Sequence, residues 1–256
     1  METLIHEKVY RGEKLLKKMS EQPFVICGVG AIGSNLVENM VRQGFKNFTV
    51  IDFDRVDDHN RHTQVWHKRD IGQLKTSVLK NYVYSIMGIT VKDVCKKLED
   101  LNVGKLLNKD SIVIDCFDNP ESRKLIYDYC KKNNIECLHI GLSMDCAEIT
   151  WNENYVIPKR SGEDICEYPM ARNIIMFSVI VGTESIIGYL RDDIKNDYMV
   201  SLNDMKVSCI KNVDSKFYVK SETSSGTTIL GSKIIGEFGV KLKNSIGVPS
   251  CQRQIL

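Results

Sequence analysis

The chain has 256 residues, with 35 Lys and Arg against 33 Asp and Glu, and its nine cysteines include no Cys-x-x-Cys pair. This length suits one large α/β domain with a small appendage. The near balance of charge gives no reason to expect nucleic acid or an anionic membrane as the main partner. The cysteine spacing disfavours a structural zinc site, and unpaired cysteines behind a charged N-terminus indicate a cytoplasmic protein.

The first 22 residues are expected to form a helical segment, because apolar and charged residues recur with a helix-like period before Pro23. Beyond it, short apolar runs that suit buried strands alternate with helix-like segments. The expected strands span 24–27, 48–51, 90–94, 111–116 and 136–141, and the expected helices span 34–44, 76–87 and 120–133. This alternation predicts a Rossmann-like, doubly wound, mostly parallel α/β sheet within residues 23–194.

The pattern changes after residue 141. Residues 146–157 suit an antiparallel extension of the sheet. The apolar segment over 169–189 suits a buried helix better than a membrane span, because polar residues interrupt it. Residues 195–256 are weakly periodic and are expected to form a small C-terminal extension.

A Gly-x-Gly-x-x-Gly motif, from Gly28 to Gly33, lies between the first expected strand and the helix after it. Its glycines allow a tight turn and let backbone N–H groups approach a phosphate at the helix N-terminus. Asp52 ends the next strand, where a carboxylate can accept both ribose hydroxyls. These features predict an adenine nucleotide. Because NAD, FAD and ATP users share them, the loop alone favours a dinucleotide-dependent oxidoreductase.

Charged residues beyond the loop favour ATP instead. A polar stretch follows Asp52, Lys75 comes next, and Asp118 follows the fourth expected strand, with Arg123 one turn later. Hydride transfer needs no cluster of cations and carboxylates around the phosphates. Nucleotidyl transfer uses cations to offset phosphate charge and a carboxylate to hold magnesium.

In order and spacing, these motifs resemble the ThiF/MoeB/HesA family, which shares its adenylating domain with the ubiquitin-activating enzymes. The matching stretches are Gly28 to Gly33, Ile51 to Val56, Asn60 with Gln64, Asp70 to Lys75, and Asp115 to Asn119 with Arg123. The resemblance implies an ATP- and Mg²⁺-dependent adenylyltransferase that activates a carboxylate through an acyl adenylate. The implied partner is the C-terminus of a ubiquitin-like protein, a sulfur-carrier protein or a short peptide, and the implied assembly is a homodimer.

The resemblance also implies roles for the matching residues. The expected nucleotide-binding residues are Gly28, Gly30, Ala31, Ile32, Gly33, Asp52, Asp54, Asn60, Arg61, Lys75, Asp118 and Asn119. Asp52 is expected to take the ribose hydroxyls, and Asn60 and Lys75 to contact phosphates. Asp118 is the expected magnesium ligand. Lys75, Asp118 and Arg123 are the expected catalytic residues, with Arg123 supporting the site or its neighbouring helix.

Three positions leave alternatives open. Relatives usually carry Asn-x-x-Arg-Gln, and Thr63 stands where that arginine would be, so either Arg61 compensates or the chain is a nucleotide-binding scaffold without turnover. Cys166 lies where some relatives carry an acyl-accepting cysteine, and it is either a catalytic thioester nucleophile or a loop cysteine packed near the site. Arg11 matches an N-terminal arginine that reaches into the partner subunit's site in relatives.

Overall fold

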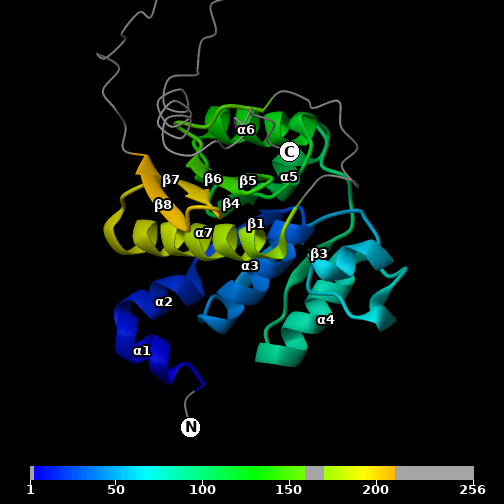
Figure 1. The fold of residues 1–256 in the computed structure, drawn as a ribbon, viewed down its shortest axis with the longest axis horizontal. Helices are drawn as coiled ribbons and strands as arrows, with labels where there is room; N and C mark the ends of the chain where they lie inside the picture. The colour runs from blue at the N-terminus through cyan, green and yellow to red at the C-terminus, as the bar shows by residue number, and fades with distance from the viewer. Residues whose placement is uncertain (1–2, 159–169, 211–256) are drawn as a thin grey trace, which may run out of the picture. The chain divides into compact units, whose positions relative to one another are not determined.

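The computed structural model describes residues 3–158 and 170–210 (Figure 1). Within these ranges the α-helices are α1 Ile5–Arg11, α2 Glu13–Glu21, α3 Ala31–Arg42, α4 Lys75–Met87, α5 Val103–Leu106, α6 Pro120–Asn133 and α7 Arg172–Asp192. Two 3-10 helices are η1 Asp58–His62 and η2 Lys68–Asp70. The strands are β1 Pro23–Cys27, β2 Asn47–Ile51, β3 Lys92–Val94, β4 Ile112–Asp115, β5 Cys137–Ser143, β6 Cys146–Trp151, β7 Asp197–Ser201 and β8 Lys206–Ile210.

These strands form one sheet in the order β3-β2-β1-β4-β5-β6-β7-β8. Strands β1 to β5 pair in parallel, whereas β6, β7 and β8 are antiparallel additions at one side. The chain leaves β1 toward β2 on one side and returns to β4 on the other, which is the strand order of nucleotide-binding α/β folds. The expected Rossmann-like, mostly parallel sheet with an antiparallel extension is confirmed.

Alternating strand side chains build two hydrophobic cores, one on each face of the sheet. In β1, Phe24 and Ile26 enter the larger core, whereas Val25 and Cys27 enter the smaller one. Helices α2, α3, α4 and α7 supply the larger core, and α5 and α6 supply the smaller one on the opposite side (Figure 1). Because both faces are covered, β1 and β4 read as continuous apolar runs rather than as alternating ones.

Helix α7 is the apolar helix expected from the sequence. By length and composition it is long and apolar enough to cross a membrane, yet 56% of its apolar window is buried within the protein. It packs against α3 and against strands β5, β6 and β7. Its apolar residues therefore serve the larger core, as the sequence predicts.

The sheet continues past the expected domain boundary at residue 194. Strand β7 pairs with β6, and β8 pairs with β7, so residues 197–210 belong to the main sheet rather than to a separate extension. The pattern is weak there because β8 is an edge strand whose side chains are mostly exposed, and it needs no apolar run. Residues 211–256 lie outside the described ranges.

Candidate active site

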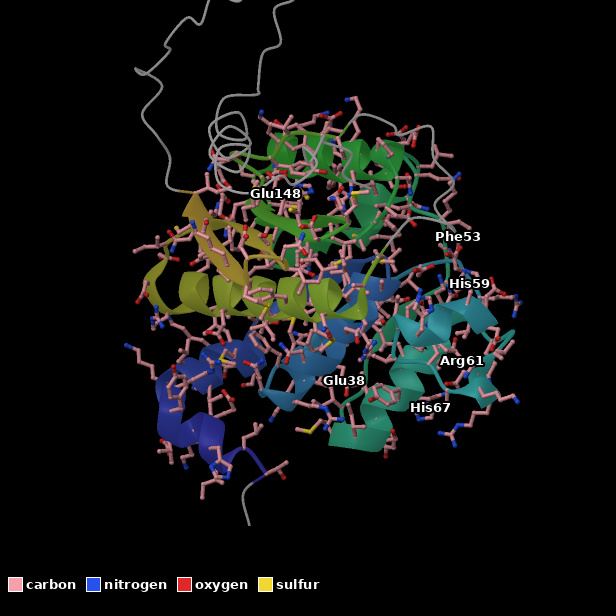
Figure 2. The ribbon with its side chains drawn as sticks, viewed as in Figure 1. Glu38, Phe53, His59, Arg61, His67 and Glu148 are labelled. Atoms are coloured by element: carbon pink, nitrogen blue, oxygen red, sulfur yellow. The ribbon has the colours of Figure 1, made fainter. Side chains whose placement is uncertain are left out.

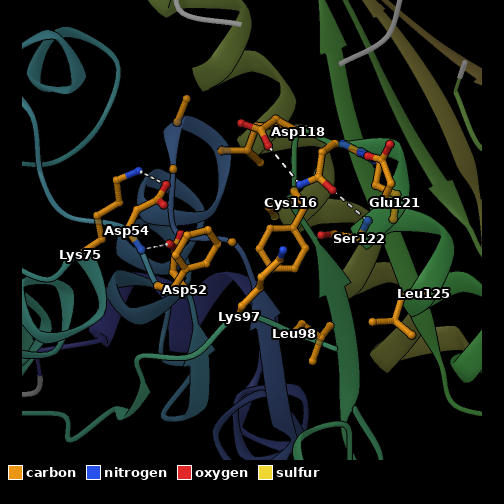
Figure 3. A pocket seen from close by; sticks show the side chains of 18 of the residues that line it. Asp52, Asp54, Lys75, Lys97, Leu98, Cys116, Asp118, Glu121, Ser122 and Leu125 are labelled. Atoms are coloured by element: carbon orange, nitrogen blue, oxygen red, sulfur yellow. Dashed lines mark hydrogen bonds and ion pairs between the residues drawn. The ribbon is translucent and has the colours of Figure 1, made fainter. Parts of the chain in front are cut away.

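The loops that follow β1, β2 and β4 meet at one edge of the sheet. Since β1 pairs with both β2 and β4, the loop after β1 lies between the other two. Together they border an open cavity of about 1300 Å³ (Figure 3). Eleven of the predicted site residues line it, namely Gly28, Gly30, Ala31, Ile32, Asp52, Asp54, Asn60, Lys75, Asp118, Asn119 and Arg123. Gly33 and Arg61 do not line it, and Cys166 lies outside the described residues.

Glycine is needed at each of the three motif positions for a different physical reason. A Cβ on Gly33 would lie 1.9 Å from the Gly28 carbonyl oxygen, so Gly33 permits close packing of α3 on the loop rather than contact with a ligand. Gly28 has a φ of +89°, which a larger residue would adopt only with strain. A Cβ on Gly30 would meet no heavy atom within 4 Å, so Gly30 leaves open space on the cavity side. Gly30 is also the N-cap of α3, whose positive end suits a phosphate.

Asp52 ties the glycine loop to the end of β2. Its Oδ2 accepts the Val29 N–H at 2.8 Å, and its Oδ1 accepts the Asp54 N–H at 2.8 Å. The side chain is 6% exposed, and this burial raises the pKa of Asp52 above its ordinary value, although the backbone donors partly offset it. Each carboxylate oxygen retains a second acceptor direction. Binding of the ribose by Asp52 therefore stays a prediction compatible with this geometry.

Lys75 projects from the first turn of α4 and pairs with Asp54. The two are joined by a 2.9 Å contact between Lys75 Nζ and Asp54 Oδ2, drawn as a dashed line in Figure 3. The segments that carry them are also joined by backbone, because the Lys75 N–H donates to the Asp54 carbonyl at 2.9 Å. The ammonium group is thus held at the cavity wall by a carboxylate that is 49% exposed.

Helix η1 presents Asn60 and Thr63 to the cavity but turns Arg61 away. A 3-10 helix repeats every three residues, so positions 60 and 63 share a side that position 61 does not. Arg61 pairs instead with Asp58, its Nε lying 2.8 Å from Oδ1, in the peripheral segment after β2 (Figure 2). This geometry gives no support to the expectation that Arg61 binds nucleotide or replaces the missing arginine, and that expectation stays a prediction.

Asn60 is held by its own helix cap. Its Oδ1 accepts the Asp57 N–H at 3.0 Å, which closes a capping box and orients the amide group at the cavity wall. Thr63 is 3% exposed, and its backbone carbonyl accepts a 2.7 Å hydrogen bond from Asn35 Nδ2. Arg172 reaches this region from α7, with Nη2 3.3 Å from Asn35 Oδ1. Nothing local in the sequence around position 63 indicates this contact, since it joins residues far apart in the chain.

Asp118 lies in the loop after β4, beside the start of α6. It is exposed to the cavity, and Asn119 caps α6 by accepting the Ser122 N–H at 2.8 Å. In the part of the chain that the structure describes, no group of three or more His, Cys, Asp or Glu side chains forms a metal cage. A single carboxylate fits magnesium, which is held by one or two carboxylates together with substrate phosphates. Asp118 is thus a suitable magnesium ligand only in company with a nucleotide.

Arg123 is not a free catalytic cation. Its side chain is 1% exposed, Nη2 donates to the Ile140 carbonyl at 2.8 Å, and Nη1 donates to the Tyr155 hydroxyl at 3.1 Å. Burial lowers the pKa of Arg123, but the charge of nearby Asp115 outweighs this and raises it. Arg123 therefore supports the wall behind the cavity, which agrees with its expected supporting role rather than with direct catalysis.

Arg11 is also engaged within its own chain. Its Nε lies 2.6 Å from Glu7 Oε2, and its Nη2 lies 2.5 Å from Glu184 Oε1 and 3.1 Å from Gln43 Oε1. These contacts dock α1 onto α3 and α7. In the single chain Arg11 thus holds the N-terminal helices in place, and its reach into a partner subunit's site stays a prediction.

The same fold is found in solved structures of other proteins. The crystal structure of E. coli MccB with ATP superposes with a TM-score of 0.66 at 17% identity, covering 80% of this chain and 69% of that one. Likeness at that identity establishes the fold alone.

Relatives are found by sequence as well. The chain is 30% identical over 116 residues to the adenylyltransferase and sulfurtransferase UBA4 of Lodderomyces elongisporus, covering 44% of this chain and 26% of that protein. It is 31% identical over 129 residues to the tRNA threonylcarbamoyladenosine dehydratase of Haemophilus influenzae, covering 49% of each. The chain thus spans half or less of these curated relatives.

The model of the ThiF family matches residues 4–163, which include the glycine loop, the Asp54–Lys75 pair and Asp118. The match covers well over half of the chain. An oxidoreductase is not favoured by any of these likenesses. The chain belongs to the ThiF family.

Proposed function

We propose that this chain is an ATP- and Mg²⁺-dependent adenylyltransferase that converts a carboxylate into an acyl adenylate. The observation that carries the proposal is the convergence of the glycine loop, the Asp54–Lys75 pair and Asp118 on one cavity at the switch point of the sheet. A nicotinamide enzyme would have no use for Lys75 and Asp118 at the phosphates.

The cavity offers a suitable wall for each part of ATP. Phe53, Leu98 and Phe117 line the cavity and provide apolar surface for a purine ring. Asp52 then faces the ribose, and the glycine loop with the N-terminus of α3 faces the phosphates. Phosphate oxygens would take over the Lys75 ammonium from Asp54, whose half-exposed carboxylate can be resolvated.

The chemistry follows from these positions. A carboxylate oxygen of the substrate forms a bond to the α-phosphorus, the bond to the bridging oxygen breaks, and pyrophosphate leaves with the electron pair. Because the attacking group is already an anion, no general base is needed. Lys75 offsets charge that grows on the phosphates in the transition state. Asp118 would hold a magnesium ion, which would supply further charge neutralisation.

The substrate is proposed to be the C-terminal carboxylate of a peptide, a sulfur-carrier protein or a ubiquitin-like protein. Of the described residues that line the cavity, eight are acidic and six are basic. Such a surface has no excess of Lys and Arg, on which the binding of a nucleic acid backbone depends. A second candidate is a carboxylate carried on tRNA, which the likeness to tRNA threonylcarbamoyladenosine dehydratases favours. Adenylation of a peptide with no adenylation of tRNA would separate the two.

ATP–pyrophosphate exchange tests the proposal. We expect exchange that requires Mg²⁺ and a carboxylate substrate, and that falls sharply in Asp118→Asn. Asp93→Asn is a matched control, since it makes the same change at a carboxylate that does not line the cavity. ATP binding without exchange for any partner would support a scaffold without turnover, and failure to bind Mg²⁺–ATP would refute the proposal.

We further propose that the protein is a cytoplasmic homodimer. Light scattering on the purified full chain tests the assembly, with twice the mass of 29.2 kDa as the expected result. A single chain mass at micromolar concentration would contradict it.

A further inference from the structure

A buried polar cluster lies directly behind the cavity, and the adenylation chemistry has no evident use for it. Its centre is the pair of Asp115, which ends β4, and His139 in β5, each exposed by 1% or less. The two are register partners in the parallel β4–β5 pair, so both side chains leave the sheet on the same face. That face is the one covered by α6, because Val113 and Cys137, two residues earlier in each strand, belong to the core beneath α5 and α6.

Asp115 and His139 are joined by a hydrogen bond of 2.8 Å between Oδ2 and Nδ1. Burial alone would raise the pKa of Asp115, but the charge of Arg123 and the hydrogen bond from His139 hold it below its ordinary value. The Asp115 carboxylate, which also faces the Arg123 guanidinium at 3.6 Å, accepts this hydrogen bond, so Nδ1 of the imidazole carries a proton.

The imidazole ring is fixed on its other sides too. Nε2 lies 2.8 Å from Asn152 Oδ1, and the ring of Tyr155 stacks on it with centroids 3.6 Å apart and planes 1° from parallel. The Tyr155 hydroxyl in turn accepts the 3.1 Å hydrogen bond from Arg123. With so many contacts, His139 has one orientation, and the direction of its Nδ1–H is set.

The same carboxylate also holds the loop that carries Asp118. While Oδ2 of Asp115 faces His139, its Oδ1 accepts the Phe117 N–H at 3.1 Å. Asp118 follows directly and has only a 3.5 Å contact from the side chain of Asn119 to one of its oxygens. The position of the Asp118 carboxylate thus depends on its backbone, and its backbone depends on the orientation of Asp115.

We propose that His139 is a positioning residue for Asp118: its Nδ1–H orients the Asp115 carboxylate, which fixes the Phe117 N–H and so the loop that presents Asp118 to magnesium and ATP. The inference rests on the proposed function, because Asp118 acts only on a nucleotide with its metal. A residue that hydrogen-bonds a metal ligand directly typically alters metal affinity about 10- to 100-fold when removed. His139 acts on Asp118 through two successive hydrogen bonds, so we expect an effect near the lower end of that range.

Two substitutions of His139 separate positioning from packing. The amide nitrogen of an asparagine can take the place of Nδ1 and still donate to Asp115, whereas a glutamine reaches toward the Nε2 side and leaves Asp115 without that donor. Both lose the stacked ring, so both carry a similar packing cost. His139→Asn is therefore the rescuing variant and His139→Gln the disrupting one.

The readout is ATP binding to the full chain by calorimetry, once with Mg²⁺ and once with ATP and a chelator. For His139→Gln we expect binding with Mg²⁺ to weaken about tenfold or more, while metal-free binding changes by less than about twofold. His139→Asn should bind Mg²⁺–ATP nearly as the wild type does. Equal losses with and without Mg²⁺, or equal losses in the two variants, would overturn the inference.

Failure of the proposed function has a different signature. If the wild-type chain binds no ATP in either medium, the proposed function is refuted. If it binds Mg²⁺–ATP and both variants bind as the wild type does, only the role of His139 is refuted.

A measurement on the unmodified chain covers the case in which His139→Gln does not fold. The chain has five histidines, and His6, His59, His62 and His67 are exposed, whereas His139 is buried. His139 should therefore give the one slowly exchanging imidazole N–H signal in a proton NMR spectrum. A shift of that signal on adding Mg²⁺–ATP, beyond the shift with ATP and chelator, is the expected result. The same response to both additions would overturn the inference.

Discussion

Replacing Lys75 by methionine should separate catalysis from stability. The Lys75 side chain is 9% exposed. Methionine keeps its unbranched apolar stem and removes only the ammonium group. Asp54, the carboxylate left behind, is 49% exposed and therefore remains solvated. An ion pair with one partner this exposed contributes about 0–1 kcal/mol, so the free energy of unfolding should change by no more than that.

The effect on the reaction should be much larger. Lys75 is proposed to offset charge that develops on the phosphates, and removal of one such group typically costs about 2.7–4 kcal/mol of transition-state stabilisation. We therefore expect ATP–pyrophosphate exchange to fall about 100- to 1000-fold, with a smaller change in ATP affinity.

The same helix provides a matched control. Lys80 also projects from α4 and forms a pair of the same kind, its Nζ lying 2.8 Å from Asp93 Oδ1, but it does not line the cavity. Lys80→Met should alter stability by a similar small amount and leave the exchange rate unchanged. The reasoning would be refuted if the two variants lost activity equally, or if Lys75→Met lost activity only in proportion to unfolded protein.

Three further outcomes are expected. Gly33→Ala forces a Cβ against the Gly28 carbonyl oxygen, so it should lower the melting temperature and abolish ATP binding. The added Cβ of Gly30→Ala meets no heavy atom within 4 Å, so that variant should melt as the wild type does. Equal melting temperatures of the two variants would contradict this. Burial raises the pKa of Asp115, but the Arg123 guanidinium beside it more than compensates, so the pKa in the folded protein lies below the unfolded value of 3.8. The ionised Asp115 therefore stabilises the fold above pH 3.8, and this contribution is lost as the pH falls below that value. The free energy of unfolding, measured with a denaturant at pH values above and below 3.8, should fall as the solution is acidified. A free energy of unfolding that rises on acidification would contradict this prediction. Cys166→Ser should leave ATP–pyrophosphate exchange intact, because carboxylate attack on the α-phosphate needs no thiol, and a loss of exchange would refute that order of steps.

The parallel half of the fold is predictable because burial on both faces leaves a plain signal. The runs at β1 and β4 are continuously apolar up to Cys27 and Ile114, and the glycine loop marks where β1 ends. The antiparallel edge of the sheet is harder to predict from the sequence, because β8 exposes most of its side chains and its pairing with β7 has no local sequence signature. The four-residue helix α5 was likewise too short for a helical period to be visible.

Motif spacing found eleven residues that line the cavity, but not how each one is used. Arg61 is adjacent in sequence to Asn60, yet a 3-10 helix directs it to Asp58 and away from the cavity. Arg123 matches the motif, but its guanidinium is buried and donates hydrogen bonds to the Ile140 carbonyl and the Tyr155 hydroxyl. The pairing of Asp115 with His139 depends on strand register across β4 and β5, which the sequence does not encode locally. Contacts between distant segments are the part that required the structure.

The central claim, adenylation of a carboxylate, is tested most directly by mass spectrometry. The chain is incubated with Mg²⁺–ATP and either a small protein ending in Gly-Gly or a short peptide, each with a free C-terminus and, in parallel, as the C-terminal amide. The account predicts an adduct of one AMP on the free acid, release of pyrophosphate, and no adduct on the amide. ATP hydrolysis without an adduct on any carboxylate, or binding of a nicotinamide cofactor in place of ATP, would contradict it.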